Sequence, residues 1–237
     1  MCTVILRVPD RHGDAIRLLA VRDEDPARPW NPLGPWWQDL PGVTGVQDRR
    51  AGGAWLATHS GSGRLAVLLN RPGEPRLPAA NILSRGSLPL EAVAGRDLPR
   101  VPHTRGFNLV SVADGAATLT TWDGETLSRT PIAPGTHMIA HDDLDDPRTA
   151  RITAWLAEFR DAALGDGPDW FLPWTEVLAR TTTTRPTDDR AIIRDNRPFG
   201  IPTLSTLACV ADIRADRVDT RYAELRVPGA WDPLDFT

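Results

Sequence analysis

The chain opens on two apolar runs of strand length, MCTVILRV at residues 1–8 and AIRLLAVRDE at residues 15–24, on either side of the segment PDRHGD at residues 9–14. β-branched and aliphatic side chains favour extended backbone, and Pro, Asp and Gly favour the turn between the two runs. These residues therefore predict a hairpin. Its first residue after the initiator is Cys2, and its second strand ends in three charged residues, at positions 22–24.

Cys2 is the first candidate for a catalytic residue. Removal of Met1 would leave a thiol and a free α-amine on the same carbon, which titrate near ~8.5 and ~7.7–8.0. A neighbouring cation would then create a thiolate at neutral pH, and Arg22 is the candidate for that cation. Asp23 or Glu24 would orient the amine or the arginine. The alternatives are a small apolar core residue at position 2 and a salt-bridged turn at the three charges.

Composition indicates one globular domain over residues 1–237, with 41% apolar and 24% charged residues. No apolar stretch is long enough to cross a bilayer, so we expect no stable membrane insertion. The first residues lack the basic region of a signal peptide, and we expect a cytoplasmic protein. The two cysteines, Cys2 and Cys209, lie far apart in the sequence and fit a reducing compartment.

Charge and motifs exclude several classes of function. All 27 basic residues are arginines, and they are scattered among 31 acidic residues, so a nucleic-acid groove is not expected. The segment HDDLDD at residues 141–146 lacks the glycine and spaced oxygen ligands of an EF-hand loop, and acids before a helix explain it more simply. No phosphate-binding or dinucleotide motif occurs. We therefore expect neither a metal nor a cofactor.

The order of elements along the chain predicts the fold class. Further strands are expected at 53–59, 64–70, 107–112, 117–122, 126–130, 136–141, 203–213 and 218–227, helices at 148–164 and 170–179, a short helical segment at 88–94, and loops at 25–48 and 181–195. Strands therefore flank a helical pair. This order predicts an αββα sandwich in the α+β class, with two stacked, mostly antiparallel sheets flanked by helices.

Four more residues are candidates for contacts with a ligand: Trp37, Trp55, Asn108 and His141. Trp37 belongs to a proline-rich loop, where aromatic side chains either line a pocket or hold the loop on the core. Asn108 lies within an apolar strand, where its amide needs a partner in either the backbone or a ligand.

The assembled motifs resemble the NRDE family, also called the transport and Golgi organisation 2 family. The motifs are Met1-Cys2, Ala20-Val21-Arg22-Asp23-Glu24 with Arg28-Pro29, Gly52-Gly53-Ala54-Trp55-Leu56, Asn70, Ser84-Arg85-Gly86, Gly106-Phe107-Asn108-Leu109, Pro134-Gly135-Thr136, and Phe199-Gly200 followed by Ser205-Thr206. Their order and spacing, over nearly the whole chain, carry the resemblance.

The resemblance implies the fold of an N-terminal-nucleophile (Ntn) hydrolase. In the similar cysteine amidases the mature chain starts at cysteine, the thiolate attacks an amide, and the α-amine moves the proton. On that resemblance Cys2 is the nucleophile, and Asn70, in Leu68-Leu69-Asn70-Arg71-Pro72-Gly73, is an oxyanion donor. The implied activity is that of a hydrolase or acyltransferase acting on a C–N amide bond of a small molecule. From the residues alone, Asn70 is equally a turn residue.

Three positions depart from the family pattern: Val21, His141 and Pro202 replace polar residues. They favour an alternative function, a non-catalytic binding or trafficking protein for a hydrophobic small molecule such as a lipid, an acyl thioester or haem. Whether the chain is an enzyme, which molecule it takes and its oligomeric state stay open at this stage.

Overall fold

Two antiparallel sheets, stacked face to face, organise the molecule. The computed structural model describes residues 2–11 and 13–237, and every strand pairing within them is antiparallel. Sheet A has the strand order β10-β1-β2-β11-β12, and sheet B runs from β3 to β9 in chain order. The strands are β1 (Thr3–Val8), β2 (Ile16–Glu24), β3 (Trp30–Gly34), β4 (Val43–Asp48), β5 (Ala54–His59), β6 (Arg64–Asn70), β7 (Phe107–Ala113), β8 (Ala116–Trp122), β9 (Leu127–Pro131), β10 (Gly135–Ile139), β11 (Leu204–Ile213) and β12 (Val218–Glu224).

The opening hairpin forms as the sequence predicts. β1 and β2 pair with Thr3 opposite Val21, and continuing this register by one residue places Cys2 opposite Arg22. Side chains alternate between the two faces of a strand. Val4 and Leu6 therefore share a face with Cys2, and all three belong to the apolar layer between the sheets.

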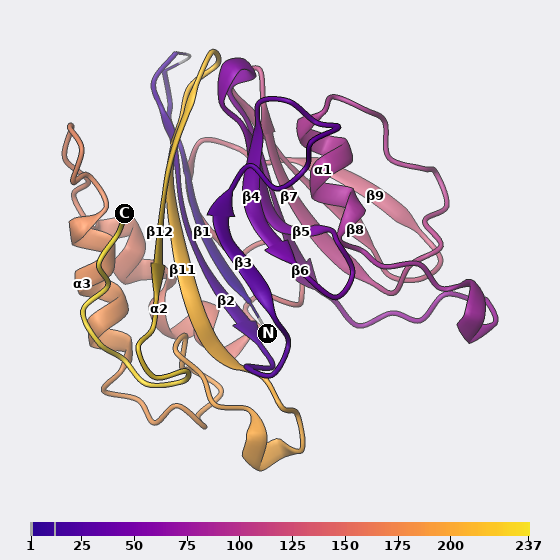
Figure 1. Cartoon of the computed structure of the whole chain (residues 1–237). Coiled ribbons are helices and arrows are strands. Elements are labelled where there is room, and N and C mark those ends of the chain that lie inside the picture. Colours follow the sequence, from indigo (N-terminus) through magenta and orange to yellow (C-terminus); the bar gives the residue numbers. More distant parts are fainter. Residues whose placement is uncertain (1, 12) are drawn as a thin grey trace.

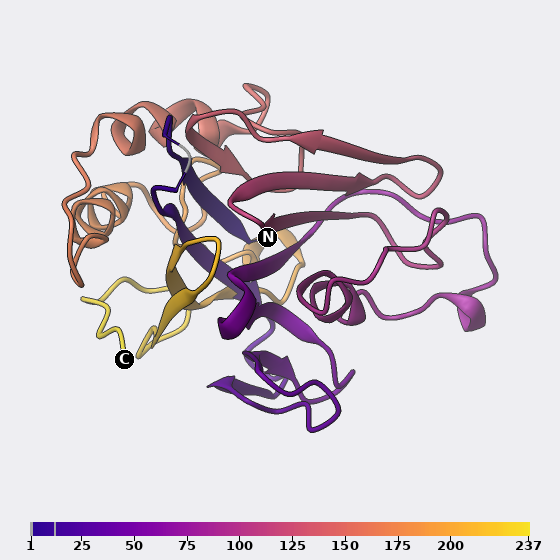
Figure 2. The same ribbon diagram turned by 90° about the horizontal axis from the view of Figure 1, so that it is seen from above.

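Helices cover the two outer faces. α2 (Ala150–Asp161) and α3 (Leu172–Thr181) lie on sheet A, and α1 (Ser87–Val93) lies on sheet B (Figures 1 and 2). On sheet A, the outward side chain of Ile5 joins an apolar cluster with Phe159 of α2. The layers follow one another as helices, sheet, sheet, helix, and the predicted αββα sandwich of the α+β class is confirmed.

The prediction of a long irregular loop over residues 25–48 is wrong. This segment contains β3 and β4, which extend sheet B by two strands. Its prolines suggested a loop, but β3 is an edge strand, where a proline such as Pro32 costs no ladder hydrogen bond on its open side. β3 pairs irregularly, with a register shift between Asn31 and Gly34.

The segment 181–195 is not simply a polar surface loop. Residues 191–194 are buried, and Ile192 and Ile193 belong to the apolar cluster beneath the helices of sheet A. The polar residues around them hide this short apolar run. Arg194, the last of the four, donates its backbone N–H to Ser205 Oγ at 2.9 Å and so fixes the segment to β11.

No helix in the described part of the chain has the length and apolarity needed to cross a bilayer.

Candidate functional site

Cys2 lies at one end of the two sheets, just before β1. The residue is 7% exposed, and the backbone N–H of Asp23 donates to Cys2 Sγ at 3.4 Å. This contact follows from the hairpin register, because Asp23 is the residue after the position opposite Cys2. Burial disfavours the thiolate, so it raises the pKa of the Cys2 thiol, although the nearby Arg22 charge acts in the opposite direction.

Arg22 occupies the inner face of sheet A with Cys2. Alternation along β2 places it on the same face as Leu18 and Ala20, and its side chain is buried. Arg22 Nη2 donates to Glu24 Oε2 at 3.2 Å, and Nη1 has no hydrogen-bond acceptor among the described residues. The guanidinium carbon lies 5.6 Å from the centre of the Trp30 ring, a cation–π contact.

Asp23 points to the opposite face of the same strand. Its Oδ1 accepts a hydrogen bond from Ser205 Oγ at 2.5 Å, and both side chains are buried. The pairing of β2 with β11 shifts register between Ser205 and Leu207, directly beside Arg22 and Asp23. A bulge of this kind re-aims the side chains around it. The Asp23 side chain is therefore hydrogen-bonded to Ser205 of β11, whereas the Arg22 side chain faces sheet B.

A small pocket of about 150 Å³ opens at this end of the molecule. It brings together residues from both sheets and from the segment before α1: Cys2, Arg22, Asp23, Glu24, Arg28, Asp48, Ala54, Trp55, Leu68, Asn70, Ser84, Arg85 and Gly86. All five residues proposed from the sequence as catalytic thus line one pocket, and so does Trp55.

Ion pairs join part of the pocket wall. Arg28 Nε donates to Asp48 Oδ2 at 2.9 Å and lies 3.9 Å from Glu24 Oε2, so Glu24 lies between Arg22 and Arg28. Burial raises the pKa of the Asp48 carboxyl, but hydrogen bonds from Arg28 and from backbone N–H groups outweigh it and keep that pKa below its usual value. Both carboxylates are therefore already paired with arginines.

Two further lining residues approach from sheet B. Asn70 ends β6 with an exposed side chain at the pocket. Trp55 on β5 is almost fully buried, and its Nε1–H has no acceptor among the described residues. Both carry side-chain N–H donors, so the wall on this side offers donors to a bound group.

Three sequence candidates lie outside the pocket. Trp37 Nε1 donates to Gly52 O at 2.8 Å, and Trp37 holds its loop against sheet B. Asn108 is fully buried and donates its amide to Ala140 O at 3.2 Å and to Asp142 O at 2.6 Å, which ties β7 to the segment after β10.

His141 lies at the same end of sheet A as Cys2 but does not line the pocket. Its Nε2 is 3.3 Å from Asp142 Oδ2. Burial lowers the pKa of its imidazole, and although the Asp142 carboxylate opposes this effect, the nearby Arg151 charge adds to it. His141 is thus kept neutral by its surroundings at neutral pH.

Arg28, Asp48 and Arg85 were not identified as site residues from the sequence. The structure shows why: each comes from a different segment, and only the stacking of the sheets brings the segments together. Two of the three, Arg28 and Arg85, lie in motifs that carry the family resemblance, Arg28-Pro29 and Ser84-Arg85-Gly86. These motifs are the one feature of the sequence that points to them as site residues.

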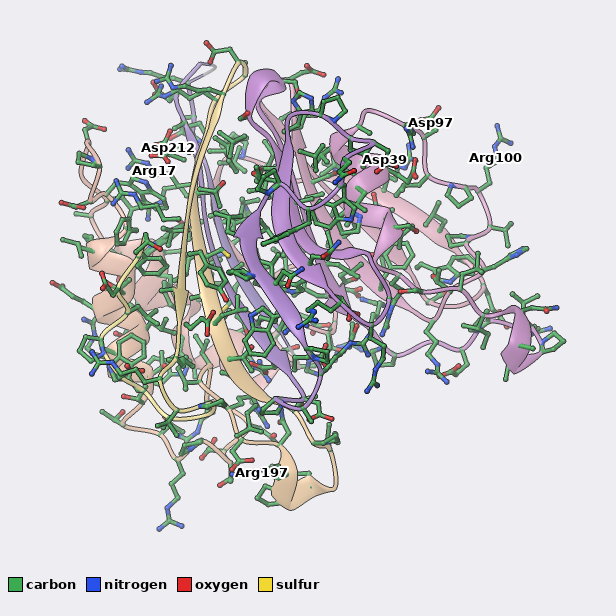
Figure 3. All side chains as sticks on the ribbon, viewed as in Figure 1. Arg17, Asp39, Asp97, Arg100, Arg197 and Asp212 are labelled. Carbon is green, nitrogen blue, oxygen red and sulfur yellow. The ribbon has the colours of Figure 1, made fainter. Side chains whose placement is uncertain are left out.

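The opposite end of sheet A carries an ordinary cross-strand ion pair instead of such a pocket wall. Arg17 of β2 and Asp212 of β11 are register partners, with Nε 3.5 Å from Oδ2 (Figure 3). Within the described residues, no group of three or more His, Cys, Asp or Glu side chains is placed to hold a metal ion.

Comparison with known proteins identifies the family and the fold. Residues 1–196 match the family model described as Transport and Golgi organisation 2. A comparison with curated proteins finds no match. Among solved structures, the fold is similar to that of the Caenorhabditis elegans ortholog of N-acylethanolamine-hydrolyzing acid amidase, with a TM-score of 0.50 over 89% of this chain and 92% of that chain at 9% sequence identity. This similarity concerns the fold, which is that of an Ntn hydrolase.

Proposed function

Because the chain belongs to the Transport and Golgi organisation 2 family and has the fold of an Ntn hydrolase, we propose that it cleaves a C–N amide bond of a small molecule. Cys2 is the nucleophile in this proposal. The acyl group passes to water, or to another acceptor in an acyltransferase. The observation that carries the proposal is that Cys2, Arg22 and Asn70 line one pocket.

The reaction begins at the Cys2 sulfur. Sγ attacks the amide carbonyl carbon, an S–C bond forms, the C–N bond breaks, and the thiol proton goes to the leaving nitrogen. Water then attacks the thioester, which releases a carboxylic acid and returns the proton to sulfur. The free α-amine of a chain that starts at Cys2 would carry these protons. Met1 lies outside the described residues, so its removal is part of the proposal.

The other pocket residues have distinct roles in this mechanism. Arg22 stabilises negative charge on the sulfur, and Glu24 holds its guanidinium through the 3.2 Å contact. Asp23, anchored by Ser205, orients the amine. Asn70 donates its amide N–H to the oxyanion of the tetrahedral intermediate. Trp55 contacts the substrate from the sheet B side.

Binding without turnover is the second candidate function. It is favoured by the burial that raises the pKa of Cys2, because a protonated thiol is a poor nucleophile. The pocket itself limits the ligand. Sites for drug-sized molecules occupy ~300–1,000 Å³ and are mostly apolar, whereas this pocket of about 150 Å³ has charged and polar walls. A lipid chain or haem is a poor match for it, so we favour the amide reaction.

The two cysteines are both free and buried, which supports our proposal that the chain works in the cytoplasm, where thiols stay reduced.

Amine release from a panel of small N-acyl amides tests the proposed reaction. The processed chain should release the amine, and Cys2→Ala should abolish release while keeping the circular dichroism spectrum. Cys209→Ala is the matched control, because Cys209 is a buried thiol in the core outside the pocket, and it should retain activity. Equal amine release by the Cys2→Ala variant and the unmodified chain would exclude Cys2 as the nucleophile.

A further inference from the structure

The pocket beside Cys2 contains three arginines, and only two of them are paired with carboxylates. Arg22 pairs with Glu24, and Arg28 pairs with Asp48. The third is Arg85, half-buried in the segment before α1. Within the described part of the chain, no carboxylate lies within ion-pair distance of it.

The Arg85 side chain has a single hydrogen bond to the rest of the described protein. Its Nη1 donates to the backbone carbonyl of Gly106 at 2.8 Å. Burial lowers the pKa of its guanidinium and the like charge of Arg105 acts in the same direction, whereas Cys2 and the Glu24 carboxylate oppose this shift. An arginine nevertheless stays protonated at neutral pH. The pocket therefore contains a guanidinium that forms no direct ion pair with a carboxylate of the described residues, and a bound anion would supply that contact.

The same pocket wall holds donors that lack acceptors. Arg22 Nη1 and Trp55 Nε1 are both buried without a hydrogen-bond partner among residues 2–11 and 13–237. Buried donors in native proteins are nearly always satisfied, so these two donors, which belong to residues that line the pocket, fit an acceptor supplied by a ligand. The wall also has three carboxylates, and all of them already accept hydrogen bonds within the protein: Glu24 and Asp48 from arginines, and Asp23 from Ser205.

A close backbone contact fixes Arg85 at the pocket. A Cβ atom on Gly53 would lie 2.4 Å from the carbonyl carbon of Gly86, so only glycine permits this approach. The N–H of Ala54 donates to Gly86 O at 2.8 Å and closes the contact. The residue next to Arg85 is thus hydrogen-bonded to the start of β5, which fixes the backbone there, and the bond to Gly106 O orients the guanidinium before a ligand arrives.

Pocket size limits the anion to a small one. About 150 Å³ equals the volume of an engineered cavity that binds benzene. A planar carboxylate matches the fork of a guanidinium, which binds it through two parallel hydrogen bonds. A long acyl chain does not fit within the pocket walls.

We propose that Arg85 binds the carboxylate of a small N-acyl amino acid, and that the pocket thereby selects an anionic substrate. This inference rests on the proposed function for the presence of an amide in the ligand. The recognition itself depends only on Arg85 and on the free donors of the wall.

Calorimetric titration with a matched pair of probes tests the inference. N-acetylglycine carries the carboxylate, and N-acetylglycinamide replaces it with a neutral amide of the same shape. Hydrogen bonds to charged groups contribute about 1.5–3 kcal/mol, so the Cys2→Ala chain should bind N-acetylglycine roughly tenfold or more tightly than N-acetylglycinamide. The Cys2→Ala background prevents turnover during the titration.

Three variants in that background show whether the preference comes from Arg85. Arg85→Gln should abolish it and Arg85→Lys should keep part of it. Arg105→Gln should preserve it, because Arg105 is an exposed arginine paired with Glu74 that adds positive charge near the pocket without lining it. A thermal unfolding curve for each variant shows that it is folded.

Equal affinity for the two probes, no binding of either, or an equal loss of preference in Arg85→Gln and Arg105→Gln would overturn the inference. The two proposals can fail separately. If the chain shows an Arg85-dependent preference but releases no amine from any N-acyl amide, carboxylate binding by Arg85 is supported and only the amidase reaction is contradicted.

Discussion

At the scale of single residues, burial sets the reactivity of the Cys2 thiol. A raised pKa leaves the thiol protonated at neutral pH. The thiolate fraction grows only as the pH rises above the ordinary pKa of a cysteine thiol. A free α-amine on the same residue would change this behaviour, because it would take the proton locally. The state of the N-terminus should therefore decide the pH profile of the thiol.

Alkylation kinetics measure this effect. In a chain whose N-terminus is blocked by a tag, iodoacetamide should react with Cys2 at least about tenfold more slowly than with free cysteine at neutral pH, and the rate should still rise above about pH 9. The processed chain should reach its plateau at a lower pH. A Cys209→Ser background leaves one thiol to follow by mass spectrometry. A plateau below about pH 8 in the blocked chain would contradict the raised pKa.

Ser205 provides a second test at this scale, because its hydroxyl is buried against the Asp23 carboxylate. Ser205→Ala leaves that carboxylate without one of its hydrogen bonds and should lower the free energy of unfolding by about 1–3 kcal/mol. Ser128→Ala, on the exposed face of β9, is the control and should change it by less than about 0.5 kcal/mol. Urea denaturation gives both values, and equal values would show that the Ser205 contact contributes nothing.

At the scale of elements, the contact between Gly53 and Gly86 links the start of β5 to the Arg85 segment. Gly53→Ala should push that segment away, cost about 1–3 kcal/mol of stability and remove the preference for the anionic probe. Gly61→Ala is the matched control, since a Cβ there meets only His59 at 3.8 Å. Urea denaturation and the titration report both effects. Wild-type stability and probe preference in Gly53→Ala would refute this role of the contact.

The elements differ in how far the sequence predicts them. The hairpins of β1–β2, β5–β6 and β7–β8 follow from local alternation and turn residues, which act within a few positions. β3 and β4 lie in a segment whose prolines resemble those of a loop. Only β3 contains one of them, Pro32, and its edge position tolerates it, whereas β4 contains none. The short buried run at 191–194 was missed because its burial depends on α2 and α3.

The candidate site was predictable only in part, for the same reason. Cys2, Arg22 and Asn70 lie at strand ends and in recognisable motifs, and the structure places them at one pocket. Arg85 reaches that pocket through a glycine contact between distant segments, which no local pattern reveals. The sequence makes Asn108 a candidate for a ligand contact, but its amide donates to two backbone carbonyls and its Oδ1 accepts from Thr121.

At the scale of the whole molecule, the chain beyond the family match completes the fold. The match ends at residue 196, yet β11 lies between β2 and β12 in sheet A and supplies Ser205 to Asp23. Removing β11 would turn β2 into an open edge strand. It would also expose apolar side chains on both faces of sheet A, where β11 packs beside β2 and β12.

A chain that ends at residue 196 should therefore not fold. We expect no cooperative thermal transition by circular dichroism, where the full chain should show one. A chain that lacks only residues 231–237 is the control. It loses the backbone pair between Thr237 and Tyr222 but keeps β11 and β12, so it should melt cooperatively at a lower temperature. A cooperative transition in the 1–196 chain would mean that β11 is dispensable.

The mass of the N-terminal peptide, after the purified chain is incubated with N-acetylglycine and quenched with acid, tests the central claim most directly. We expect a peptide that begins at Cys2, and a fraction that carries one acetyl group on its sulfur. A peptide that retains Met1 and has an unmodified Cys2, in a chain that binds the probe, would contradict the claim.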